Sequence, residues 1–155
     1  MRKGSAIKAA INTTLQKTWV AANNGTRLDN LIVRFAGTGA SMHENCSSRG
    51  LCVTITLPDF KDDHAYTDAH ANRILAFALH EIGQAFFTDS SLWEKTVKAN
   101  DRDEFLHRCI NAFDDVQQEA ALIRSGYAVG VKPLFTALLQ HITCLLYTSP
   151  SPRDQ

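Results

Sequence analysis

The stretch ALHEIGQAFFTD, Ala78–Asp89, carries the residues with the clearest chemical potential in this chain. His80 and Gln84 are spaced so that on a helix they share one face, and Glu81 lies about 100° further round. In the pattern H-E-x-x-H this geometry lets two histidines bind zinc while the glutamate takes a proton from a metal-bound water. Here an amide, which is a poor zinc ligand, stands in place of the second histidine. Taken alone, the stretch indicates either a weakened metal site or an ordinary polar helix face.

A second segment, INAFDDVQQEA at residues 110–120, gathers acids and amides on one flank of a predicted helix. Asn111, Asp115 and Glu119 follow one another at four-residue spacing. From residue 110 to residue 123 there is no basic residue, whereas a solvated helix face normally mixes Lys or Arg among its acids. Such uncompensated acids favour a cation site, because a further zinc ligand is commonly a carboxylate on a second helix.

One more histidine is close enough in sequence to take part. His107 precedes Asn111 by one turn and is close in helical angle to Asp114, so it is an alternative ligand for the position that Gln84 fills. The other interpretation is a surface histidine near a helix terminus.

The helices that must position these residues follow from hydrophobic spacing and capping signals. Apolar residues at helical spacing predict a first helix from about Ile7 to Trp19. Thr67 or Asp68 can cap a long helix that runs to about Phe87. A second long helix is predicted over roughly 102–124 before a Ser-Gly stop, and Pro133 is expected to open a third that runs into His141.

Two β-branched runs, Leu31–Gly37 and Leu51–Leu57, predict strands. The thirteen residues between them are rich in turn formers, so the two runs are separate strands or a hairpin with a long loop. Together these elements predict an α+β fold in which a small β-sheet packs beside two long helices.

Composition excludes several classes of partner. A chain of 155 residues with 45% hydrophobic content predicts one globular domain. Basic and acidic residues balance at 16 each, so we expect no nucleic-acid partner. No run of about 18 apolar residues predicts a membrane span, and four cysteines without C-x-x-C spacing favour a reducing cytoplasmic location.

Three of these pieces, HEIGQAFFTD, SLWEKTV and NAFDDVQQE, follow the strand and loop TITLPDF. This combination resembles the metallopeptidase-like N-terminal region of CobT-type and phage or bacterial von Willebrand A proteins, over roughly Leu51–His141. The resemblance implies a zincin-like arrangement, a Zn²⁺ cofactor and a protein or peptide substrate or partner. It also implies that residues 1–143 are a zincin-like metallopeptidase domain, C-terminally truncated before a von Willebrand A domain.

The resemblance assigns roles to residues by their position. It implies that His80 is a zinc ligand, that Glu81 is the general base, and that Asp115 is the third ligand or Asp114 in its stead. Glu119 would orient the ligands.

Asn111 would share this orienting role, while Gln84 stands where the family has a histidine ligand. The main expectation is therefore a zinc-dependent metallohydrolase with a degenerate HEIGQ motif. The alternative is a catalytically inactive zincin-like module that works as a binding partner or adaptor.

The end of the chain has a different character. Cys144 to Asp154, CLLYTSPSPRD, resembles residue for residue the in-frame translation of a transposase adapter used in sequencing libraries. We therefore expect residues 144–155 to be an adapter-derived tail, with native sequence continuing past Thr143. The alternative is a natural Pro/Ser tail.

Overall fold

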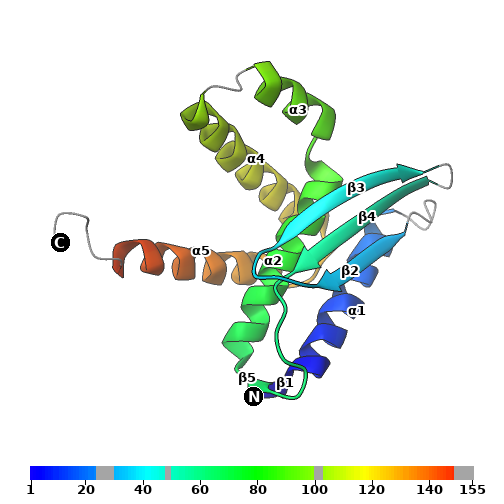
Figure 1. Cartoon of the computed structure of the whole chain (residues 1–155), viewed down its shortest axis with the longest axis vertical. Helices are drawn as coiled ribbons and strands as arrows, with labels where there is room; N and C mark the ends of the chain where they lie inside the picture. Colours follow the sequence, from blue (N-terminus) through cyan, green and yellow to red (C-terminus); the bar gives the residue numbers. More distant parts are fainter. Residues whose placement is uncertain (24–29, 48–49, 100–102, 149–155) are drawn as a thin grey trace.

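The computed structural model describes residues 1–23, 30–47, 50–99 and 103–148 (Figure 1). In chain order the elements are β1 (Arg2–Lys3), α1 (Gly4–Ala22), β2 (Leu31–Phe35), β3 (Ser41–Ser47), β4 (Gly50–Leu57), β5 (Ala65–Tyr66), α2 (Asp68–Phe87), α3 (Ser90–Ala99), α4 (Glu104–Ser125) and α5 (Val131–Thr148). Helices and a small sheet are thus combined in one chain, and the predicted α+β class is confirmed.

The larger sheet has three strands in the order β2-β4-β3. β2 runs parallel to β4, with Leu31 opposite Val53, and β3 runs antiparallel to β4, with Ser41 opposite Thr56. The possibility of a hairpin between the two predicted strands is therefore wrong, because β2 and β4 are parallel neighbours. The segment expected to be a loop instead supplies β3, whose pairing with β4 outweighs its turn-rich composition.

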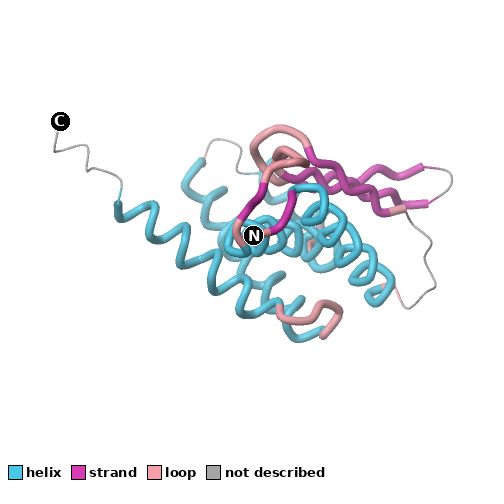
Figure 2. Tube along the Cα trace, turned by 90° about the horizontal axis from the view of Figure 1, so that it is seen from below, coloured by secondary structure: helices cyan, strands magenta, loops and turns pink. Residues whose placement is uncertain are grey.

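The core lies between this sheet and the helices. Alternate residues of β4, Val53, Ile55 and Leu57, are fully buried against them, as expected for the central strand of a sheet covered on one face. Figure 2 shows the strands along one side of the helices, and α2 lies centrally, in contact with β3, β4, α1, α4 and α5. The sequence of α2 fits this place, since small and aliphatic residues between Ala71 and Gly83 are buried.

Both ends of α2 and the C-terminal end of α4 agree with the capping signals, whereas α5 is longer than predicted. The Thr67 side chain accepts a hydrogen bond of 3.2 Å from the His70 amide, and α2 ends at Phe87 as predicted. α4 stops before Gly126, which adopts the left-handed conformation at φ 70°. α5 begins two residues before Pro133 and continues past His141 to Thr148.

Three short elements were not predicted. α3 follows α2 after a two-residue break, where the Asp89 carboxylate accepts hydrogen bonds from the Ser91 and Leu92 amides. β1 and β5 form a two-stranded antiparallel ladder that joins the chain start to the segment before α2.

No helix in the described part of the chain has the length and apolar character that crossing a membrane requires.

Candidate functional site

The candidate site lies where α2 and α4 face each other. α2 presents His80 and Gln84 on one face, as their spacing predicted, and buries Glu81 to 7% exposure. α4 approaches this face with Asp115 and Glu119, which also follow one another by one turn. The two helices pack directly on each other, so side chains that are far apart in sequence meet.

The His80 imidazole is the centre of this meeting point. Its Nδ1 lies 2.9 Å from Glu119 Oε1 and 3.0 Å from Gln118 Nε2. Its Nε2 lies 3.2 Å from Gln84 Nε2 and 3.5 Å from Asp115 Oδ1. Each ring nitrogen therefore faces one carboxylate oxygen and one amide nitrogen.

The electrostatics follow from burial and from the local excess of acids. Burial lowers the pKa of His80, but the Glu119 hydrogen bond and the charges of Asp115, Glu119 and Glu81 outweigh it, so the net pKa lies above 6.5. Burial raises the pKa of Glu81, helped by the Asp115 charge and opposed by His80 and His43. A carboxyl group that is buried and holds its proton more tightly than usual is suited to general acid-base chemistry.

Asp115 is also shifted. Burial raises its pKa above 3.8, while the His80 charge and a hydrogen bond from Gln84 act in the opposite direction. Glu119 and Asp114 add to the increase. Gln84 thus touches both Asp115 and His80, the two side chains expected to bind metal.

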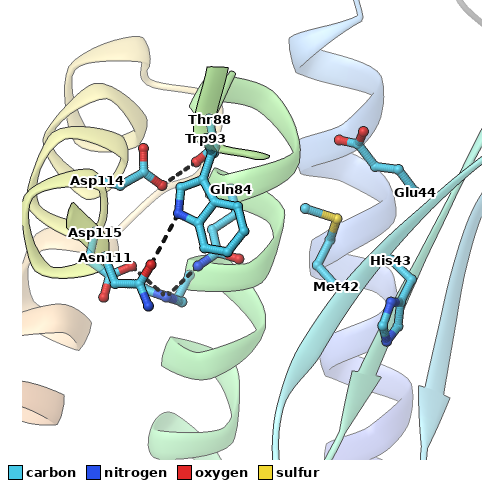
Figure 3. Close-up of a pocket in the computed structure, with 10 residues that line it drawn as sticks. Met42, His43, Glu44, Gln84, Thr88, Trp93, Asn111, Asp114 and Asp115 are labelled. Atoms are coloured by element: carbon cyan, nitrogen blue, oxygen red, sulfur yellow. Dashed lines mark hydrogen bonds and ion pairs between the residues drawn. The ribbon is translucent and has the colours of Figure 1, made fainter. Parts of the chain in front are cut away.

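Two cavities adjoin this cluster. The first, of about 500 Å³, lies between β3 and the α2–α3–α4 side of the molecule. Figure 3 shows Met42, His43 and Glu44 of β3 on one side of it and Gln84, Thr88, Trp93, Asn111, Asp114 and Asp115 on the other. None of the described residues that line it is Lys or Arg.

The second cavity, of about 660 Å³, is a mainly apolar groove between α4 and α5. His80 and Asp115 line both cavities, whereas Glu81 and Glu119 line only this one. Its remaining walls include the apolar side chains Phe77, Val116, Ile123, Phe135, Leu138 and Leu139. The expected general base therefore faces an apolar groove.

A zinc ion fits part of this arrangement. Two ligand atoms of a tetrahedral zinc site lie about 3.4 Å apart, close to the observed His80 Nε2–Asp115 Oδ1 separation. Gln84 presents its amide nitrogen there, so the amide must turn over before its oxygen can bind a metal. No group of three or more His, Cys, Asp or Glu side chains in the described residues is placed to hold a metal ion.

The other predicted residues lie nearby but make different contacts. Asn111 Oδ1 accepts a 3.1 Å hydrogen bond from Trp93 Nε1, and Asp114 accepts one of 2.6 Å from the Thr88 hydroxyl (Figure 3). Both line the first cavity and join α4 to α3 and to the end of α2.

His107 is not brought into the site. Its Nε2 lies 3.2 Å from the Val97 carbonyl oxygen on α3, so its contact holds the two helices together.

Sequence reasoning missed two residues that lie at the candidate site. Gln118, an amide in the segment 110–120, was not among the predicted site residues, although it is buried to 1% exposure and contacts His80. The absence of basic residues around it was the available signal. His43 was placed in a loop, and the assignment of that segment to β3 is what brings it to the first cavity.

Comparisons with protein-family models, with curated proteins and with solved structures give no match to this chain.

Proposed function

We propose that this chain forms a weakened zinc-dependent hydrolase site that acts on a protein or peptide. The observation that carries the proposal is the position of His80 between two carboxylates of the facing helix, Glu119 at Nδ1 and Asp115 at Nε2. Metal-binding histidines commonly donate their other N–H to a carboxylate, which fixes the ring and raises its basicity. The ligands would be His80, Asp115 and, weakly, Gln84.

Different residues of the chain would orient the metal ligands and transfer protons. Glu119 would accept a hydrogen bond from the Nδ1–H of His80 and leave the Nε2 lone pair directed toward Asp115. Zinc, when bound, would supply Lewis-acid activation of water and substrate. Glu81, buried and with a raised pKa, would take up a proton at its carboxylate and return it to the leaving group.

The groove between α4 and α5 would receive the substrate, because Glu81 opens onto it. Its lining is mostly apolar, so a segment with a large aliphatic or aromatic side chain would gain most by entering it.

A second candidate function is an inactive binding or adaptor module of the same architecture. The Gln84 contact favours it, since the amide joins His80 and Asp115 to each other by hydrogen bonds. In that case these contacts would hold α2 and α4 together without a metal.

Zinc titration of the purified chain tests the metal site. Gln84→His should raise zinc affinity by roughly an order of magnitude or more, because it replaces a weak amide donor with an imidazole. Asp115→Asn should abolish what binding the parent chain has. His107→Gln is the matched control on α4 and should bind zinc like the parent chain, since His107 contacts α3. Equal affinity of the parent and Gln84→His would contradict the ligand assignment.

Hydrolysis is tested in the Gln84→His background with an unstructured protein mixture and mass spectrometry of the products. Glu81→Gln should keep zinc and lose cleavage, because the amide preserves shape but has no basicity. If Gln84→His binds zinc but cleaves nothing, the adaptor function is favoured. If Glu81→Gln loses zinc as completely as Asp115→Asn, the division of roles is wrong.

A further inference from the structure

Gln118 is the most deeply buried polar side chain at the interface of α2 and α4. It is only 1% exposed, and its Nε2 lies 3.0 Å from His80 Nδ1. Its Oε1 is buried and has no hydrogen-bond partner in the described residues. Burial of a polar group with one end unsatisfied costs stability, so an apolar residue would serve better if packing alone were needed here.

Gly83 is the residue that makes room for this amide. A Cβ atom at position 83 would lie 2.0 Å from Gln118 Oε1 and 3.2 Å from its Cδ. A flexible side chain normally moves away from such a contact, but Gln118 is enclosed by its neighbours. Glycine in the middle of α2 lowers helix stability, and the space that it leaves is filled by the Gln118 amide.

The contacts of His80 allow two hydrogen-bond arrangements for a neutral ring, and each of them satisfies only one of the two glutamine amides. With the proton on Nδ1, the ring donates to Glu119 and its Nε2 accepts from Gln84. With the proton on Nε2, the ring faces Asp115 with a donor and its Nδ1 accepts from Gln118. The two amides therefore favour opposite tautomers.

We propose that Gln118, in the space that Gly83 leaves, is a positioning residue that directs the His80 proton to Nε2, in opposition to Gln84. The proposal rests on the proposed function in taking His80 as the functional imidazole. It assigns opposite roles to the two glutamines, because Gln84 favours the tautomer with a free Nε2 lone pair and Gln118 disfavours it.

Long-range ¹H–¹⁵N spectra of the imidazole test the direction of each effect. They are recorded without metal at a pH high enough that the His80 shifts no longer change with pH, and His80 is assigned with His80→Gln. Gln118→Met keeps the length of the side chain and removes its donor, so the two ¹⁵N shifts should move toward the Nδ1–H form. Gln84→Met is the matched variant and should move them toward the Nε2–H form. Unchanged shifts in Gln118→Met, or movement in the same direction for both variants, would overturn the proposal.

A double-mutant cycle tests the contact between Gly83 and Gln118. Gly83→Ala should lower the urea midpoint of the parent chain, because the new methyl group meets the amide. In a Gln118→Ala background the same change should raise the midpoint, since the space is open and alanine is the better helix former. An equal effect in both backgrounds would show that Gly83 and Gln118 are not coupled, and would overturn the claim that Gln118 occupies the space beside Gly83.

These measurements use the metal-free chain, so they separate the two proposals. A tautomer shift and a sign reversal without zinc binding would support the positioning role and reject the zinc hydrolase. Zinc binding without a tautomer shift and without a sign reversal would support the zinc site and reject the positioning role.

Discussion

His70 and His80 lie on the same helix, yet their surroundings shift their pKa values in opposite directions. His70 stacks on Tyr66 with ring centroids 4.6 Å apart and meets the edge of Phe60, and its Nε2 is buried without a hydrogen-bond partner in the described residues. Burial lowers its pKa below 6.5, helped by the Arg73 charge. At His80 the facing carboxylates reverse the effect of burial. The chemistry of a histidine on α2 is thus set by what packs against it.

Replacement of His70 by Phe should make the protein less sensitive to acid. The pKa of His70 is lower in the folded state than in the unfolded state. Its ring is therefore neutral in both states above the unfolded-state pKa, and the free energy of unfolding decreases as the pH falls toward and through the folded-state pKa. Urea unfolding of the parent chain should lose more stability between about pH 7.5 and about pH 5.5 than His70→Phe loses. We expect a difference below about 1 kcal/mol, because the ring is only partly buried.

His64→Gln is the control for this measurement. His64 contacts the same Tyr66 ring but is exposed, so its removal should leave the pH dependence in place. An identical pH dependence of the parent and His70→Phe would contradict the prediction.

The site residues could be predicted from spacing, but their partners could not. Four-residue spacing placed His80 with Gln84 and Asp115 with Glu119, and the structure keeps both pairs. The rotation of α4 about its axis was not predictable, because it depends on which residue fills the space beside Gly83. Burial of Gln118 and Leu122 turns Asp115 and Glu119 toward His80, and Asn111 and Asp114 toward other partners.

At the scale of elements, contacts with α3 account for the positions of two polar residues of α4 that the sequence had suggested for the site. Asn111 accepts a hydrogen bond from Trp93, and His107 contacts the Val97 carbonyl oxygen, so both side chains link α4 to α3. α3 escaped prediction because it is short and rich in polar residues. The Asp89-Ser-Ser start was a usable capping signal. β3 was missed because pairing with β4, which is non-local, overrode its turn-rich sequence.

Thr67→Ala should lower the free energy of unfolding by about 1 kcal/mol, the usual cost of an N-cap side chain. The Thr67 hydroxyl accepts a hydrogen bond from the His70 amide, and alanine leaves that amide without its partner at the start of α2. Urea denaturation measures the loss. Thr67→Ser keeps an acceptor and should behave like the parent chain, and an equal loss in both variants would show that the hydroxyl does not act as a cap.

At the scale of the whole molecule, the described part of α5 packs on the core through its first half. Its described buried residues are Val131, Phe135 and Leu138, and Figure 1 shows the helix leading away from the other helices beyond them. The backbone continues as helix to Thr148, five residues into the segment expected to be adapter-derived. Helical backbone there does not depend on origin, because a helix once begun extends at small cost.

Deletion of residues 144–155 should leave the melting temperature unchanged. Adapter-derived residues have not been selected to pack against the domain, and the described buried residues of α5 all precede them. Thermal unfolding followed by circular dichroism measures this. Phe135→Ala is the positive control and should lower stability by about 3 kcal/mol. A clear drop in melting temperature on truncation would show that the tail packs as part of the domain.

The central place of α2 has a consequence for hydrogen exchange. Because α2 contacts the sheet and three other helices, its amides should exchange only when the whole domain opens. The structure describes all of α4, and that helix buries only Gln118 and Leu122, so its amides should exchange through smaller, more frequent openings. His80 and Glu81 would then belong to the slowest-exchanging part of the molecule, while Asp115 and Glu119 would belong to a faster one. A ligand that bridges the two helices should therefore slow exchange along both of them, because it opposes every opening that breaks the site, whether of α4 alone or of the whole domain.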